Sequence, residues 1–289
     1  MMQKVNHLFD TIFSKNSQKK FEKYILLLAA GGFIAHLLLI FLNIYGFVNI
    51  EIAGNLLSNP ISALYTPFSF ILVYEAFLLI YYLPNSFTVS VVKGYEIISL
   101  ILIRKIFKDV TLVDLENPFL SNENNIQLIY DLVGFVIVFF LIYLFKTTAG
   151  KPKKPQIDKH LANFISQKKA LSILLVPVLL VLAFFNFYDW FNNVVILGRY
   201  DVNIDFLFFV DFFTILILVD VLLLLISFRY TERYSQLIRN TGFIISTIML
   251  RLSFAASGLT SIIFLVTGIL FGVVILAIFK RMEKVNYLG

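Results

Sequence analysis

The chain has 289 residues, of which 59% are hydrophobic, and its formal net charge is +6 at pH 7. This composition excludes a soluble domain of the same size, because such a domain needs far more polar surface to face water. Cysteine is absent, which also excludes disulfides and thiolate metal sites.

Eight apolar runs, taken in chain order, are long enough to cross the roughly 30 Å hydrocarbon core of a bilayer as helices. They cover residues 24–48, 61–83, 91–107, 127–145, 171–190, 206–228, 241–257 and 259–279. We therefore expect an all-α integral membrane protein with eight transmembrane helices. The third and seventh runs are short and charged, so an alternative with seven spans treats 91–107 as an amphipathic helix lying on the membrane surface.

The charges between these runs predict the orientation of the chain. Of the 24 lysines and arginines, 19 fall on one side of the eight-span arrangement. The opposite loops are acidic and carry Glu51, Asp114, Glu116, Glu123 and Asp201. Because basic loops remain in the cytoplasm, we expect both termini there. The seven-span alternative would move the basic sequence 151–155 to the wrong side.

The same basic stretch, which contains two prolines, predicts the division of the chain. The expected parts are a cytoplasmic tail (1–23), a first four-helix membrane unit (24–146), a basic cytoplasmic linker (147–170), a second four-helix membrane unit (171–279) and a cytoplasmic tail (280–289). Each unit has an even number of spans, so both insert in the same direction. The two units are then parallel repeats about an axis along the membrane normal.

A short internal repeat supports this division. The sequence IISLILIR at 97–104 is similar to IISTIMLR at 244–251, and each copy ends in an arginine. An apolar run with one carboxylate in its second half precedes each copy. Since isolated charges are costly in lipid, the registered acids and arginines are the strongest candidates for a site.

The carboxylates are Glu75 and Asp220, and the arginines are Arg104 and Arg251. Neighbouring antiparallel helices bring each acid near one arginine, so we expect two buried ion pairs, Glu75–Arg104 and Asp220–Arg251. Two interpretations remain open. The pairs are structural clamps that set helix register, or they line a polar path at the repeat interface and sense or relay charge.

The residues Tyr74-Glu75, Leu79-Ile80, Ile97-Ile98, Ile101, Arg104 and Asp109 form a recognisable pattern. In this pattern the first unit resembles the phosphate-starvation-inducible PsiE family of four-helix bacterial inner-membrane proteins. The similarity covers about 68–145 and, more faintly, 213–279, where Ala256 stands at the position of Asp109. The resemblance implies a four-helix inner-membrane unit used twice, and it brings no known active site.

Three acids near the start of the sixth run, Asp201, Asp205 and Asp211, are candidates for an outer vestibule that attracts cations. A solvated acidic rim explains them equally. His36, midway along the first run, is a candidate proton relay or a packed, hydrogen-bonded residue. The glycines of a GxxxG motif at 268–272 permit close packing, either within the bundle or to a second copy of the chain.

No motif for a hydrolase, a nucleotide-binding enzyme or a zinc site is present, so we expect no enzyme, no cofactor and no metal centre. The placement of the basic residues indicates a lipid bilayer rather than nucleic acid as the partner. Two functions remain: an ion channel or ion-coupled transporter for small ions, built by the two repeats or by homo-oligomerisation, and a non-transporting scaffold or signalling subunit. The scaffold would bind anionic lipid or a partner through its basic linker.

Overall fold

The computed structural model describes residues 2–46, 60–113, 118–150, 159–191, 204–230 and 233–286. Most of these residues are helical, and no strand is found among them. The α-helices are α1 (Met2–Ile12), α2 (Lys15–Ile44), α3 (Tyr65–Tyr82), α4 (Phe87–Val110), α5 (Glu123–Ala149), α6 (Lys159–Phe191), α7 (Ile204–Phe228), α8 (Tyr234–Ser253) and α9 (Gly258–Asn286). Two short 3₁₀ turns are η2 (Pro60–Leu64) and η3 (Phe119–Ser121).

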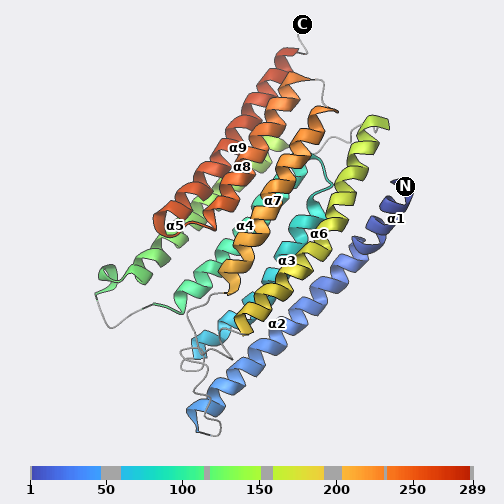
Figure 1. Ribbon diagram of the computed structural model, residues 1–289. Coiled ribbons are helices and arrows are strands. Elements are labelled where there is room, and N and C mark those ends of the chain that lie inside the picture. The colour runs from blue at the N-terminus through green and yellow to red at the C-terminus, as the bar shows by residue number, and fades with distance from the viewer. Residues whose placement is uncertain are drawn as a thin grey trace.

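The helices α2 to α9 each contain most of one run expected to span the membrane, and they alternate in direction along one bundle (Figure 1). The start of α1 and the end of α9 lie toward the same end of that bundle. Six helical segments in the described part are long and apolar enough to cross a membrane: Gln3–Ile44, Pro60–Tyr82, Glu123–Ala149, Leu161–Phe185, Val210–Phe228 and Gly258–Lys284. The helices α4 and α8 are not among them.

Large apolar side chains remain exposed on the outside of the bundle. Leu27, Val136, Phe184 and Leu218, on four different helices, are all more than half exposed. A water-soluble protein does not tolerate an apolar surface of this extent, whereas lipid tails do. The exposed apolar helices are therefore compatible with a protein embedded in a membrane.

The charged helices α4 and α8 are shielded inside the bundle. Tyr95, Ile98 and Leu102 of α4 are almost fully buried, and α4 packs against α3, α5 and α8. This packing does not favour the alternative in which 91–107 lies on the membrane surface. Neighbouring helices cover the polar groups that would otherwise face lipid.

The boundaries of α8 differ from the sequence prediction. A helix was expected over 241–257, but α8 begins at Tyr234 and ends at Ser253. The backbone N–H of Phe254 closes the last turn on the carbonyls of Arg251 and Leu252. Gly258 then starts α9 with a φ of +61°, a left-handed conformation that glycine adopts most easily. Residues 254–257 are mostly apolar, so this turn was not predicted from the sequence.

The structure also shortens the expected tails and linker. Most of residues 1–23 belong to α1 and the start of α2, and Phe13 is 4% exposed. Lys169 of α6 forms an ion pair with Asp10 at 2.9 Å, which fastens α1 to α6. Helix α5 continues to Ala149, α6 begins at Lys159, and α9 continues to Asn286.

The hydrophobic core consists of two main clusters, and each draws on both halves of the sequence. The first joins α1 and α3 to α6 and α7, with Ala76, Ile80, Leu175 and Leu216 nearly fully buried. The second joins α4 and α5 to α8 and α9. Packing therefore crosses the division at 147–170 and does not produce a separate core for each half.

A close hydroxyl contact joins the two halves within the second cluster. The Tyr95 hydroxyl on α4 lies 2.5 Å from the Ser246 hydroxyl on α8, and Ser246 donates to the Gly268 carbonyl of α9 at 2.6 Å. A Cβ on Gly272 would overlap the Tyr95 hydroxyl. The two glycines of the GxxxG motif thus serve packing within this chain.

Candidate functional site

The first acid–arginine pair joins α3 to α4. Helix α3 ends at Tyr82, shortly before Pro84, and the Ser86 side chain caps α4 by accepting a hydrogen bond from the Val89 N–H. This tight turn makes the two helices antiparallel neighbours. Arg104 and Glu75 therefore come together, with 3.8 Å between Nε and Oε2, and both are more than nine-tenths buried.

The second pair joins α7 to α8 and is closer. Arg251 Nη1 lies 2.6 Å from Asp220 Oδ2, and Thr247 donates a hydrogen bond to the same carboxylate oxygen at 3.0 Å. Asp220 is 7% exposed and Arg251 is 8% exposed. The pairing expected from the sequence is thus present in both halves, between the second and third long helices of each.

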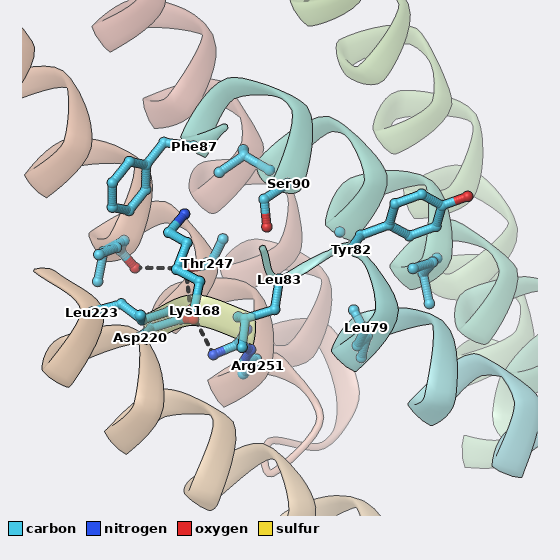
Figure 2. A pocket seen from close by; sticks show the side chains of 14 residues that line it. Leu79, Tyr82, Leu83, Phe87, Ser90, Lys168, Asp220, Leu223, Thr247 and Arg251 are labelled. Atoms are coloured by element: carbon cyan, nitrogen blue, oxygen red, sulfur yellow. Dashed lines mark hydrogen bonds and ion pairs between the residues drawn. The ribbon is translucent and has the colours of Figure 1, made fainter. Parts of the chain in front are cut away.

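A cavity of about 40 Å³ lies beside the second pair, between the two halves of the chain (Figure 2). Helices α3 and α4 line one side, and α6, α7 and α8 line the other. The charged side chains on its walls are Lys168, Asp220 and Arg251, and Ser90 and Thr247 carry hydroxyl groups. Leucine, isoleucine, valine and phenylalanine side chains form most of the remaining wall.

Sequence reasoning did not identify Lys168 as part of this site. Its ammonium donates to the Asn85 carbonyl at 2.9 Å and lies 4.2 Å from the centre of the Phe87 ring. The residue is 2% exposed and interacts electrostatically with Asp220. Because Lys168 belongs to a strongly basic stretch, its sequence context predicts a solvated lysine, whereas in the fold it is buried against Asn85 and Phe87.

A second polar cluster lies between α4 and α5, and the sequence analysis also missed it. Lys105 pairs with Asp131 at 3.1 Å, and Gln127 donates to Asp131 at 2.9 Å. Asp131 is fully buried. The sequence could have predicted this site, because Asp131 is the one acid within the apolar run 127–145 and a lone charge in such a run needs a partner.

Asp109 adjoins this cluster, two residues past the run 91–107, and is 8% exposed. Burial raises the pKa of its carboxyl to about 8, and a hydrogen bond to Asp131 and the negative charge of Asp131 act in the same direction. Lys105 and Lys108 oppose this shift. The arrangement favours the protonated form of the Asp109 carboxyl beside Asp131.

The remaining candidates are not brought together. Asp211 is exposed on α7, Asp205 lies on α7 with a side chain outside the described residues, and Asp201 lies outside them altogether. His36 is half-buried, and its Nδ1 is 2.6 Å from the Thr66 hydroxyl on α3. This contact ties α2 to α3, which is the packed state that the sequence allowed for His36.

No family model, curated protein or solved structure matches the chain. A cavity with room for a few water molecules and with three buried charges on its walls can hold a small ion, and it is far too small for a drug-sized organic molecule.

Proposed function

We propose that this chain is a multi-pass membrane protein that moves a small ion across the bilayer through a polar path between its two halves. The observation that carries this proposal is the cavity in which Lys168, Asp220 and Arg251 converge from α6, α7 and α8 (Figure 2). Buried charges in a membrane protein commonly mark ion pathways, because their cost in lipid must be offset.

In this proposal the chain crosses the membrane eight times as two parallel four-helix repeats, with both termini in the cytoplasm of a bacterial cell. The resemblance of the first unit to the PsiE family supports the bacterial inner membrane. The alternating directions of α2 to α9 support eight crossings, with α4 and α8 shielded from lipid by their neighbours.

Flux in reconstituted liposomes tests the proposal. The full chain is expected to dissipate a gradient of at least one small inorganic ion faster than protein-free liposomes do. The informative variant is the double change Asp220→Asn with Arg251→Gln, which removes both charges of the cavity pair and should lower the flux. Its matched control is Asp10→Asn with Lys169→Gln, which removes an ion pair outside the cavity.

Flux indistinguishable from that of empty liposomes for sodium, potassium, proton, chloride and nitrate would overturn the proposal. That result would favour the scaffold alternative. Residues 151–155, through which a scaffold would bind lipid or a partner, lie outside the described residues.

A further inference from the structure

We infer that the cavity between the two halves binds a small inorganic anion of about the size of chloride, attracted by the net positive charge of its walls. This inference rests on the proposed function insofar as it names the ion that the polar path carries. Binding itself can be measured without transport.

The first argument is the charge of the walls. The described lining of the cavity contains two cations, Lys168 and Arg251, and one carboxylate, Asp220. All three are more than nine-tenths buried. Arg251 lies 2.6 Å from Asp220, so that pair is internally neutral, and Lys168 leaves an excess of one positive charge. Burying an excess positive charge is costly even beside the Asp220 carboxylate, with which Lys168 interacts electrostatically, and an anion in the cavity lowers that cost.

The second argument is the supply of hydrogen-bond donors. An ammonium has three N–H donors, and in the described part of the chain the Lys168 ammonium donates to the Asn85 carbonyl. Arg251 Nη1 is buried and makes no well-aligned hydrogen bond within the described residues, although it is close to Asp220. Ser90 adds a hydroxyl to the wall. These groups are donors of the kind that bind an anion, and the net positive charge disfavours a cation.

The third argument is size. The cavity of about 40 Å³ has room for a few water molecules or one small anion. Its apolar walls offer little to a large, strongly hydrated anion such as sulfate. Chloride, bromide and nitrate fit these limits, whereas gluconate is too large to enter.

The test is the thermal stability of the purified full chain in detergent, in sodium salts of chloride, bromide, nitrate or gluconate at constant sodium and pH. A ligand that binds only the folded state raises Tm with its concentration. We expect chloride to raise Tm by several degrees over gluconate in a saturable manner. Lys168→Met keeps the apolar stem against Phe87 but removes the charge, and it should raise the chloride midpoint about tenfold or more.

Lys169→Gln is the matched control, because it removes the adjacent lysine, whose partner Asp10 lies outside the cavity. It should respond to chloride as the wild type does. If Lys168→Met does not fold, Ser90→Ala replaces it and should weaken the chloride response several-fold. The inference is overturned by equal Tm in chloride and gluconate for the wild type, or by an unchanged chloride response in the cavity variants.

Binding and flux can fail separately. A chloride-dependent Tm without any flux would support the anion site and contradict the transport proposal. Flux of a cation, with no effect of chloride on Tm, would support transport and overturn the anion site.

Discussion

At the scale of single residues, the two acid–arginine pairs share their position in the fold but differ in geometry. Arg251 approaches Asp220 to 2.6 Å, whereas Arg104 lies 3.8 Å from Glu75 and also donates to the Phe68 carbonyl at 3.5 Å. The Asp220 carboxylate on α7 lies near two cations, Arg251 and Lys168. It therefore offsets more positive charge than Glu75 does.

Asp220→Asn is expected to destabilise the protein by about 3–5 kcal/mol, because it leaves two buried cations on the cavity wall without a carboxylate. Glu75→Gln should cost less, since Arg104 keeps its contact with the Phe68 carbonyl. Denaturation in detergent with gluconate as the anion measures both. Asp10→Asn, in an exposed pair, should cost at most about 1 kcal/mol. A loss for Asp220→Asn no greater than that of this control would contradict the prediction.

Asp109 predicts a dependence of stability on pH. Its carboxyl has a pKa raised from 3.8 to about 8 in the folded protein, so between these values the folded state binds more protons than the unfolded state. Stability should therefore fall as pH rises from about 4 to about 8. Asp109→Asn, which keeps a hydrogen-bond donor for Asp131, is expected to flatten this dependence when Tm is followed across that window.

Asp211→Asn is the control for that experiment, because Asp211 is an exposed acid on α7. It should retain the slope of the wild type. A slope in Asp109→Asn equal to that of the wild type would show that the Asp109 carboxyl is not the source of the dependence.

At the scale of helices, close approach between α4, α8 and α9 depends on small residues. Gly272 faces the Tyr95 hydroxyl, and Gly268 lies against the Ser246 carbonyl and Met249. Within a membrane there is little hydrophobic force between helices, so packing and interhelical hydrogen bonds determine association. The hydroxyl contact between Tyr95 and Ser246 joins the third long helices of the two halves.

Gly272→Ala is expected to lower stability by about 1–3 kcal/mol, because the added Cβ displaces the Tyr95 hydroxyl and leaves it buried without its partner. Thermal denaturation compares it with Gly31→Ala on α2, where an added Cβ meets no atom within 4 Å. The control should be neutral or slightly stabilising, since alanine favours a helix over glycine. Equal stabilities of the two variants would exclude this role for Gly272.

At the scale of the whole molecule, the halves of the sequence are not independent folding units. Each of the two main hydrophobic clusters contains helices from before and after the linker. Separating the halves would expose Tyr95, Phe243 and Leu250, which are fully buried at their interface. Each half therefore depends on the other for the burial of these side chains.

We expect residues 1–150 and 151–289, expressed alone, to accumulate poorly, because each would lack the packing surface of the other. Expressed together, they should associate, and a tag on one half should recover the other after extraction in detergent. Stable accumulation of either half alone, with a cooperative thermal transition, would contradict a shared core.

The sequence by itself determined the helical class, the approximate position of each long helix and the partners in both ion pairs. Apolar runs of bilayer length, and lone charges within them, can be identified directly in the sequence. Consecutive helices joined by a short turn lie next to each other, so the ion-pair partners could be predicted as well. The start of α8 was missed because residues 234–240 are largely polar, and its end was missed because the turn after Ser253 is as apolar as the helix before it.

Only the tertiary structure decided which faces of these helices meet. The sequence cannot show that Lys168 is buried against Asn85 and Phe87, because a lysine at the edge of a basic stretch looks solvated until distant residues cover it. The same holds for Asp131 with Lys105, and for the core that both halves share. Burial depends on contacts between residues distant in the chain, and those contacts create both the cavity and its charge.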